Sequence, residues 1–254
     1  MSECKILLSG ANGRLGRAII ASAGEAGCRI IAGVDIAPTA GTIPMYGSLS
    51  ELPELDADCI VDCSHHTAAL PLLAFAKEHK LPVVICTTGH TPEEVAAIHE
   101  AAQTIPVFYS RNMSVGINLL IGLAKKAASV LGDDFDIEIV EKHHNKKLDA
   151  PSGTALMIAD AISESVSYEP EYVYERQSKR APRSKNEIGI HSIRGGTIVG
   201  EHDVIFAGTD EVITLSHQAA SREVFARGAL RAAKFVKGRA PGFCNMETLV
   251  DETL

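Results

Sequence analysis

The chain has 254 residues, of which 46% are hydrophobic and 22% charged, and its formal net charge is −8 at pH 7. This length gives room for one large or two modest domains with ample core, and the acidic balance argues against a nucleic-acid-binding protein. We expect no membrane partner, because no apolar stretch is judged to reach membrane-spanning length, and no secretory signal is evident at the start.

The N-terminal segment predicts a dinucleotide-binding element. Residues 5–9 form a short apolar run typical of a buried strand, residues 10–16 read GANGRLG, and a helix is expected over 17–23. Glycines at such a turn let the backbone approach a pyrophosphate at a helix N-terminus. A second strand over 30–35 ends in Asp35, where a carboxylate can accept hydrogen bonds from ribose hydroxyls. The G-x-x-G-x-x-G spacing is not the commonest one, so a tight turn without a ligand is the alternative.

Three further apolar runs, over residues 59–62, 82–86 and 106–109, predict strands, with a helix over 67–79. Another helix is expected from Thr91, which is followed by a proline and two acids. Strands that alternate with helices favour a parallel sheet covered on both faces, and such sheets bind ligands at the carboxyl ends of their strands. The residues expected at such ends include Gly10, Asp35, Thr87, Thr88 and residues 110–113.

The pattern changes after residue 113. Helices are expected over 114–132 and 153–166, with a strand over 136–141 between them. Three strand-like runs then follow with no helix between them, which predicts a mixed or largely antiparallel sheet; they cover residues 188–193, 197–207 and 211–217. A final helix over 222–236 is expected to return to the first domain.

We therefore predict an α/β chain of two domains. Residues 1–113 and 222–254 would form a Rossmann-like, parallel-sheet dinucleotide-binding domain, and residues 114–221 an α+β domain with a mixed sheet. The polar, basic segment 176–187 is expected to be an exposed loop, and a mobile lid over an anionic ligand is the alternative.

The scattered cysteines and histidines carry little functional signal. Cys59 and Cys63 have no second cysteine pair to complete a zinc site, so we expect no metal and a reduced, cytoplasmic chain. His65 and His66 are expected in a loop or helix cap near the cofactor domain. Two later histidines are expected on sheet faces, namely His202 and His217.

Residues 141–155, EKHHNKKLDAPSGTA, say most about function. Histidine and lysine can both donate protons near neutral pH when their pKa values are tuned. The turn before residue 155 opens a predicted helix, whose Ser152, Gly153 and Thr154 offer N–H groups and hydroxyls to an anion. The segment thus places proton donors beside a carboxylate or phosphate site. A solvated basic loop followed by an ordinary helix cap is the alternative.

This run resembles the E-x-H-H-x-x-K-x-D-A-P-S-G-T-A signature of bacterial 4-hydroxy-tetrahydrodipicolinate reductases, the dihydrodipicolinate reductase family of lysine biosynthesis. The resemblance runs nearly end to end and includes residues 10–16, 87–89, 112–116, 188–196 and 199–202. Cys86 stands where the family often has glycine, and His90 where an aromatic residue is common. The segment 176–187 lacks a glycine that the family has there.

The resemblance implies a reaction and a set of site residues. NAD(P)H would deliver a hydride to C4 of 4-hydroxy-tetrahydrodipicolinate while its hydroxyl leaves as water, giving tetrahydrodipicolinate for lysine and diaminopimelate synthesis. His143 and Lys147 would be the catalytic proton donors. A substrate carboxylate would be bound by His144, Ser152, Gly153 and Thr154. The implied cofactor-binding residues are Gly10, Ala11, Asn12, Gly13, Arg14, Leu15, Asp35, Cys86, Thr87, Thr88, Ser110, Arg111, Asn112 and Met113.

The family resemblance also bears on cofactor choice and assembly. Members that use both cofactors place an arginine directly after the acid that ends the second strand, whereas Ile36 follows Asp35 here. We therefore expect NADH to be preferred over NADPH, with Arg14 as the nearest cation that could help NADPH. The resemblance further implies that the second domain binds the dicarboxylate substrate and forms a homotetramer through its sheet.

Two other functions remain open from the sequence. The chain could be another nicotinamide oxidoreductase of amino-acid metabolism, against which the His-His-x-x-Lys and Pro-Ser-Gly-Thr run argues. It could also be a non-catalytic dinucleotide-sensing protein, but a sensor has no need of His143 and Lys147 as paired proton donors.

Overall fold

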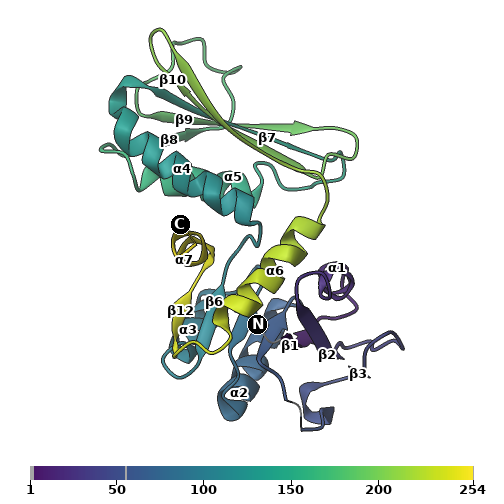
Figure 1. Cartoon of the computed structure of the whole chain (residues 1–254). Coiled ribbons are helices and arrows are strands. Elements are labelled where there is room, and N and C mark those ends of the chain that lie inside the picture. Colours follow the sequence, from purple (N-terminus) through teal and green to yellow (C-terminus); the bar gives the residue numbers. More distant parts are fainter. Residues whose placement is uncertain (1–2, 55, 254) are drawn as a thin grey trace. The chain divides into compact units, whose positions relative to one another are not determined.

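The computed structural model describes residues 3–54 and 56–253, and the chain folds into two compact units. The first unit contains Met1–Val115 and Arg222–Leu254, and the second contains Gly116–Ser221 (Figure 1). The first unit is therefore discontinuous in sequence, because the last segment of the chain returns to it.

A seven-stranded sheet forms the centre of the first unit, in the order β12-β6-β5-β4-β1-β2-β3, and every neighbouring pair is parallel. Its strands are β1 Cys4–Ser9, β2 Cys28–Val34, β3 Met45–Tyr46, β4 Cys59–Asp62, β5 Val83–Ile85, β6 Pro106–Tyr109 and β12 Gly242–Cys244. The predicted Rossmann-like parallel sheet is confirmed. Because all strands run in one direction, their carboxyl ends meet at a single edge, where a ligand of such a sheet binds.

Helices cover both faces of this sheet (Figure 1). Successive side chains of a strand point to opposite faces, so Ile6 and Leu8 of β1 face one side and Leu7 the other. The helices that pack with Ile6 and Leu8 are α1 Arg14–Ser22, α6 Glu223–Val236 and α7 Met246–Asp251, and those that pack with Leu7 are α2 Ala69–His79 and α3 Pro92–Ala101. Two short 3-10 turns complete the unit, η1 Leu49–Glu51 and η2 His66–Ala68.

The start of α3 follows the sequence prediction. The Thr91 hydroxyl accepts a hydrogen bond from the Glu94 N–H at 3.3 Å, and the Glu94 carboxylate accepts one from the Thr91 N–H at 2.8 Å, with Pro92 at the first helical position. This reciprocal cap satisfies two backbone donors at the helix start. It also fixes the Glu94 side chain at the carboxyl-end edge of the sheet.

The second unit is built on a five-stranded sheet in the order β11-β10-β7-β9-β8. Its strands are β7 Asp136–His143, β8 Glu171–Val173, β9 Glu187–Arg194, β10 Gly200–Ala207 and β11 Val212–Ala219. The sheet is mixed, as predicted, because β7 pairs in parallel with β9 and antiparallel with β10. The helices α4 Val115–Leu131 and α5 Gly153–Ser163 pack on one face, with η3 Gly132–Asp134 between α4 and β7.

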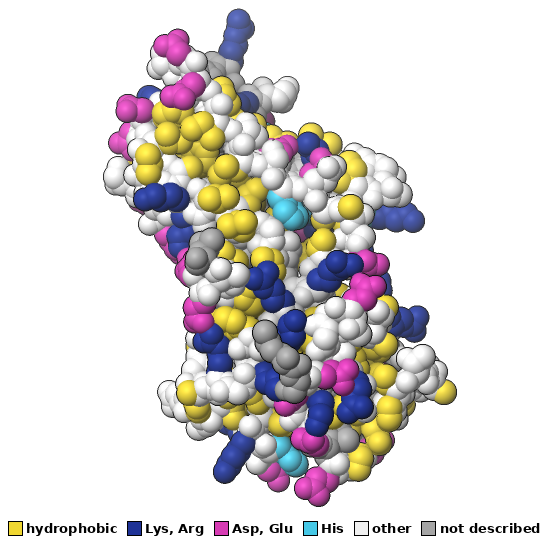
Figure 2. Space-filling model, viewed as in Figure 1, with side chains coloured by type: hydrophobic (Ala, Val, Ile, Leu, Met, Phe, Trp, Pro, Cys, Tyr) yellow, Lys and Arg dark blue, Asp and Glu magenta, His cyan; other side chains and the backbone are white. Residues whose placement is uncertain are grey.

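The helix α4 corrects one expectation from the sequence. Together with η3 it forms a helical segment, Val115–Asp134, that is long and apolar enough to cross a membrane by length and composition alone, with a mean hydropathy of 1.4. Two adjacent lysines interrupt the apolar run in the sequence, but the average over the helix tolerates them. Leu120, Ala124 and Ala128 are buried in the core of the second unit, whereas Leu119 and Leu123 are exposed. Figure 2 shows hydrophobic side chains gathered over this helix.

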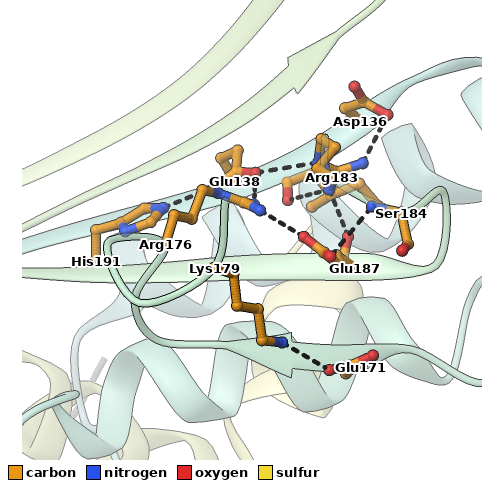
Figure 3. A network of polar contacts seen from close by, with 10 residues as sticks. Asp136, Glu138, Glu171, Arg176, Lys179, Arg183, Ser184, Glu187 and His191 are labelled. Carbon is orange, nitrogen blue, oxygen red and sulfur yellow. Dashed lines mark hydrogen bonds and ion pairs between the residues drawn. The ribbon is translucent and has the colours of Figure 1, made fainter. Parts of the chain in front are cut away.

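The basic segment 174–186 is an irregular loop tied to the face of the sheet opposite the helices (Figure 3). The Arg176 guanidinium donates to Glu138 at 2.6 Å and to Glu187 at 2.5 Å. The Arg183 guanidinium donates to Asp136 at 2.6 Å and to Glu138 at 3.3 Å, and His191 pairs with Glu138 at 2.7 Å. The Glu138 carboxylate thus pairs with two guanidinium groups and one imidazole. The two arginines are engaged with acids of their own unit, which weakens the alternative of a lid that offers them to a ligand.

Replacing Glu138 by alanine should release this loop. Arg176, Arg183 and His191 would lose their common acceptor, so the exposed bonds after Lys179 and Arg180 should be cut faster by trypsin. The measurement is limited proteolysis with mass-spectrometric mapping of the first cut. Glu201→Ala is the matched control, because the Glu201 side chain lies on the same face and pairs with Lys142 and Gln218 of the described chain, neither of which belongs to the loop. Equal cleavage in both variants would contradict the anchoring role.

Candidate active site

The glycine-rich turn joins β1 to α1 and lies against the end of β4. Gly10 has φ of +78°, and a Cβ at this position would come within 2.7 Å of the Cys63 backbone, so only glycine fits. A Cβ on Gly16 would lie 2.3 Å from the Gly10 carbonyl oxygen. Gly13, the residue before α1, supplies no side-chain cap, which leaves N–H groups of the first turn to other acceptors. The turn has the close backbone approach and the donors that a pyrophosphate requires.

Asp35 follows β2 and reaches back to this turn. Its carboxylate accepts hydrogen bonds from the Asn12 N–H at 2.9 Å and from the Ala37 N–H at 3.1 Å. The neighbouring Ile36 side chain is fully exposed (100%). The acid is therefore fixed beside the glycine turn, where a carboxylate can meet a ribose diol. Arg14, the first residue of α1, is exposed.

A cleft of about 250 Å³ opens at the carboxyl ends of β4 and β5. It brings together four of the expected cofactor residues with four that follow β4, and its lining is Leu15, Cys63, Ser64, His65, His66, Cys86, Thr87 and Thr88. Asp62, the last residue of β4, is buried (1% exposed) and organises the floor. It accepts hydrogen bonds from the hydroxyls of Ser9 at 2.8 Å, Ser64 at 2.6 Å and Thr87 at 2.6 Å.

The expected cofactor residues after β6 do not line this cleft. Ser110 and Asn112 are buried and bind within their own turn, where the Ser110 hydroxyl donates to the Asn112 carbonyl at 2.9 Å. Met113 belongs to the core on the α1 and α6 face, and Arg111 is exposed. Residues 110–113 therefore lie at the same edge of the sheet as the cleft, but they are not among the residues that line it.

In the second unit, the inner row of β7 changes from apolar to ionisable. The row runs from Ile139 to Glu141 and His143, since alternate residues share a face. Glu141 is completely buried and accepts two hydrogen bonds from Arg194 of β9, at 2.7 and 2.8 Å, and one from His143 Nδ1–H at 2.6 Å. Burial alone would raise the pKa of this carboxyl, but hydrogen bonds from Arg194, Ser192 and His143 lower it to about 2.

His143 ends β7 with its two ring nitrogens in different roles. A carboxylate can only accept, so the Nδ1 proton goes to Glu141 and Nε2 is left for other partners. Burial lowers the pKa of His143, although Glu141 acts in the opposite direction. His202 of β10 lies edge-on to this ring at 5.3 Å, and burial lowers the pKa of His202 to about 4. Both rings are therefore neutral near pH 7 in the free protein.

The helix start at residues 152–154 is fastened to the same acid. The Ser152 N–H donates to Glu141 at 3.1 Å. The Ser152 hydroxyl accepts a hydrogen bond from the Ala155 N–H at 3.1 Å and also forms a hydrogen bond with His202 Nε2 at 3.1 Å. Ser152 is 2% exposed and serves to cap and place the helix. Open space surrounds the position of a Cβ on Gly153, so this first turn of α5 is accessible to a ligand.

Lys147 and His144 lie on the turn between β7 and α5. The Lys147 ammonium pairs with Asp149 at 2.8 Å, and this hydrogen bond lowers the pKa of Asp149. The Lys147 N–H donates to the His144 carbonyl at 3.1 Å, which closes the turn. His144 Nδ1 is buried without a hydrogen-bond partner among the described residues. The turn before α5 thus holds a lysine paired with an acid and a buried imidazole nitrogen that has no hydrogen-bond partner among the described residues.

Sequence reasoning missed the residues that hold these groups in place. Glu141 stands two residues before His143, and this spacing on a predicted strand could have suggested a shared face. Arg194 carries no local signal, because its pairing with Glu141 depends on the register between β7 and β9. Asp62 was treated only as a strand residue. In the part of the chain that the structure describes, no group of three or more His, Cys, Asp or Glu side chains could hold a metal.

The parallel sheet with its glycine-rich turn and the acid after β2 is typical of a dinucleotide-binding oxidoreductase. Family models described as the N-terminus and the C-terminus of dihydrodipicolinate reductase match residues 4–113 and 116–250. The chain belongs to the dihydrodipicolinate reductase family, whose members are NAD(P)H-dependent oxidoreductases. The resemblance that the sequence predicted is confirmed.

Similar proteins cover almost the whole chain. The 4-hydroxy-tetrahydrodipicolinate reductase of Caldanaerobacter subterraneus subsp. tengcongensis is 54% identical over 247 residues, which is 97% of this chain and 98% of that protein. That of Clostridium tetani is 46% identical over 249 residues, 97% of each chain. A dipicolinate-bound dihydrodipicolinate reductase from Paenisporosarcina sp. TG-14 has the same fold, with a TM-score of 0.80 at 22% identity over 96% of this chain and 97% of that chain.

Proposed function

We propose that the chain reduces 4-hydroxy-tetrahydrodipicolinate to tetrahydrodipicolinate, with loss of water, in lysine and diaminopimelate biosynthesis. The observation that carries the proposal is the cluster at the end of β7, where Glu141 joins His143 to the start of α5. It combines a proton-transfer group with a helix N-terminus that suits a carboxylate. The names of the close relatives and the dipicolinate bound to the structural neighbour support the substrate class.

NAD(P)H, when bound, supplies the hydride, and the side chains supply protons and binding contacts. The hydroxyl of the substrate leaves as water, so it needs one proton, which His143 or Lys147 can provide. The pKa of His143 is lowered in the free protein, and a dianionic substrate would raise it again because nearby negative charge favours imidazolium. Glu141 keeps the ring oriented with Nε2 free. The first turn of α5, with Gly153 and Thr154, and His144 would hold one carboxylate.

A coupled assay tests this function directly. The synthase that condenses pyruvate with aspartate semialdehyde supplies the unstable substrate, and oxidation of NAD(P)H is followed by absorbance. We expect turnover that depends on the synthase. If a folded preparation oxidises neither NADH nor NADPH under these conditions, the assignment is wrong.

Replacing Thr154 by alanine should weaken the carboxylate site. A hydrogen bond to a charged group is worth about 1.5–3 kcal/mol, so KM for the dicarboxylate should rise about tenfold or more with a smaller change in kcat. A pyridine dicarboxylate should inhibit competitively and weaken in parallel. Thr209→Ala, in the exposed turn between β10 and β11, is the control. If the pyridine dicarboxylate inhibits Thr154→Ala as strongly as it inhibits the wild type, the segment is an ordinary helix cap and not a carboxylate site.

We also propose that NADH is the preferred cofactor. Asp35 can accept hydrogen bonds from a ribose diol and repels a 2′-phosphate, and the exposed Ile36 beside it offers no charge. At low ionic strength, kcat/KM should be higher with NADH than with NADPH. Ile36→Arg should make this difference in kcat/KM smaller, because the arginine adds a partner for the 2′-phosphate. A tenfold preference for NADPH in the unmodified chain, about 1.4 kcal/mol, would contradict this role for Asp35.

We also propose that the chain forms a homotetramer and is located in the cytoplasm. The outer face of the second unit's sheet carries a mixture of paired charges and apolar side chains suited to self-association, such as Lys142 with Glu201 and the partly buried Ile205. All six cysteines are free thiols, which fits a reducing compartment. Light scattering on the eluted protein would give the number of subunits.

A further inference from the structure

The cofactor cleft of the first unit contains an imidazole, His66, that the sequence assigned no role. His66 opens the short turn η2, which follows β4 after residues 63–65, and lines the cleft together with Thr87 and Thr88. Its side chain is 29% exposed, and Nδ1 lies 3.0 Å from both carboxylate oxygens of Glu94. The ring is therefore held at the cleft by a residue of α3.

Glu94 fixes which nitrogen of His66 carries the proton. Hydrogen bonds from the Thr91 N–H and from His66 lower the pKa of Glu94, so the group is an ionised carboxylate near pH 7. A carboxylate only accepts hydrogen bonds, so Nδ1 of His66 must be the protonated nitrogen. In the neutral ring Nε2 is then an acceptor. Among the described residues Nε2 has no hydrogen-bond partner, and it is the one polar atom that the ring can still offer to a ligand.

The surroundings make this arrangement rigid. Glu94 is 8% exposed and is held by the reciprocal cap with Thr91. His90, whose side chain is fully buried, lies 3.5 Å from the same carboxylate and packs edge-on against Tyr109 at 5.5 Å. The His65 ring lies tilted by 42° against His66, at a centroid distance of 4.3 Å, with its Nδ1 paired to the Thr67 hydroxyl at 2.9 Å. His66 is thus oriented before any ligand arrives.

The position of the cleft tells which part of a dinucleotide it would meet. Asp35 stands at the end of β2, on one side of β1, and suits the ribose of the adenosine half. The cleft lies at the ends of β4 and β5, on the other side of β1. A dinucleotide whose pyrophosphate sits on the β1–α1 turn extends its two halves to the two sides. The nicotinamide-riboside half therefore reaches the cleft, and its ribose hydroxyls and carboxamide N–H groups are hydrogen-bond donors.

We propose that His66 is a cofactor-binding residue of this chain, whose Nε2 accepts a hydrogen bond from the nicotinamide-riboside half of the dinucleotide, and that Glu94 is the positioning residue that keeps it an acceptor. The proposal rests on the function proposed above and adds a specific contact to it.

Direct binding of NADH, followed by cofactor fluorescence, tests the contact without turnover. His66→Ala should weaken NADH roughly two- to tenfold, the size of one neutral hydrogen bond. His66→Phe keeps a ring without an acceptor and should lose the same amount, which guards against a folding defect of the smaller side chain. His66→Gln keeps an acceptor oxygen and should bind more tightly than either. His79→Ala, at the exposed end of α2, is the matched control.

Cofactor fragments show where the donor lies. ADP lacks the nicotinamide riboside and should bind the wild type and His66→Ala equally. If a ribose hydroxyl is the donor, ADP-ribose loses as much as NADH; if the carboxamide is the donor, reduced 3-acetylpyridine adenine dinucleotide loses nothing. Both patterns support the proposal. Equal NADH affinity in the wild type and both acceptor-free variants, or an equal loss for ADP, would overturn it. Failure of the folded wild type to bind NADH would instead refute the proposed function.

Glu94→Gln tests the positioning role. The amide oxygen can still accept the Thr91 N–H and keep the helix cap, while the amide N–H₂ can donate to Nδ1 and leave Nε2 protonated. Long-range ¹H–¹⁵N spectra at mildly alkaline pH should therefore show Nδ1–H in the wild type and Nε2–H in the variant, with NADH weakened as in His66→Ala. An Nε2-protonated His66 in the wild type would overturn the assignment of Glu94.

Discussion

His143→Gln and Lys147→Ala should each lose on the order of a hundredfold or more in kcat, the usual scale for a positioned acid catalyst. His143 ends β7 with Nδ1 bound to Glu141, which leaves Nε2 as the other ring nitrogen for proton transfer, and glutamine cannot reproduce an ionisable group at that point. Lys147, paired with Asp149, holds its charge beside the start of α5. Affinity for NADH should change little, because both residues belong to the second unit.

The measurement is steady-state turnover in the coupled assay together with NADH binding by fluorescence. Lys146→Ala is the matched control, since Lys146 is the exposed neighbour in the same turn. Near-normal kcat in both His143→Gln and Lys147→Ala would rule out their catalytic role. A parallel loss of NADH binding would point to a general structural defect.

Glu141→Gln should destabilise the fold in a pH-dependent way. The pKa of Glu141 is about 2 in the folded chain, against 4.5 for an unperturbed glutamate, so the ionised form favours folding. That contribution is fully present above pH 4.5 and is lost as pH falls through the interval down to about 2. A shift of this size corresponds to roughly 3 kcal/mol, and the variant also leaves the Arg194 guanidinium without its counter-ion.

Urea unfolding of the wild type and Glu141→Gln at several pH values measures this difference. The gap in free energy of unfolding should be largest near neutral pH and should shrink as the pH is lowered below 4.5. Glu201→Gln, a partly exposed glutamate on the outer face, should show little change. A gap that stays constant down to pH 3 would show that the charge of Glu141 is not what stabilises the site.

Local patterns in the sequence were sufficient for most of the fold. The alternation of apolar strands and helices gave the parallel sheet, and the capping residues gave the start of α3. The strands β3, β8 and β12 were not predicted, because two or three residues without a longer apolar run around them are too few to show a period. They exist because a longer neighbouring strand offers them backbone partners. The expectation that no apolar stretch reaches membrane-spanning length was wrong for α4. Two lysines interrupt the apolar run, but the mean hydropathy over the helical segment is still high enough.

The residues of the candidate site likewise fall into two groups, those that a local pattern reveals and those that meet only in the folded chain. His143, Lys147 and Gly153 all lie within the fifteen-residue run 141–155, so a local motif could reveal them. Arg194 and Glu141 meet through strand pairing between residues more than fifty positions apart, and no local pattern encodes that register. His66 and Glu94 meet because η2 and the start of α3 share one edge of the sheet, which requires the packed structure. The groups that orient a site were therefore harder to find than the groups that act in it.

The return of the chain's last segment to the first unit sets an order for synthesis on the ribosome. Ala229, Leu230 and Ala233 of α6 fill the face of the sheet beneath the glycine turn, together with Ile6 and Leu8 of β1. A nascent chain that has emerged only to residue 221 lacks this cover, so the sheet face that α1 and α6 share is only partly covered. The core of the first unit is thus completed only after every residue of the second unit has been translated. Premature termination anywhere before α6 would therefore remove part of the core on which the dinucleotide-binding strands pack.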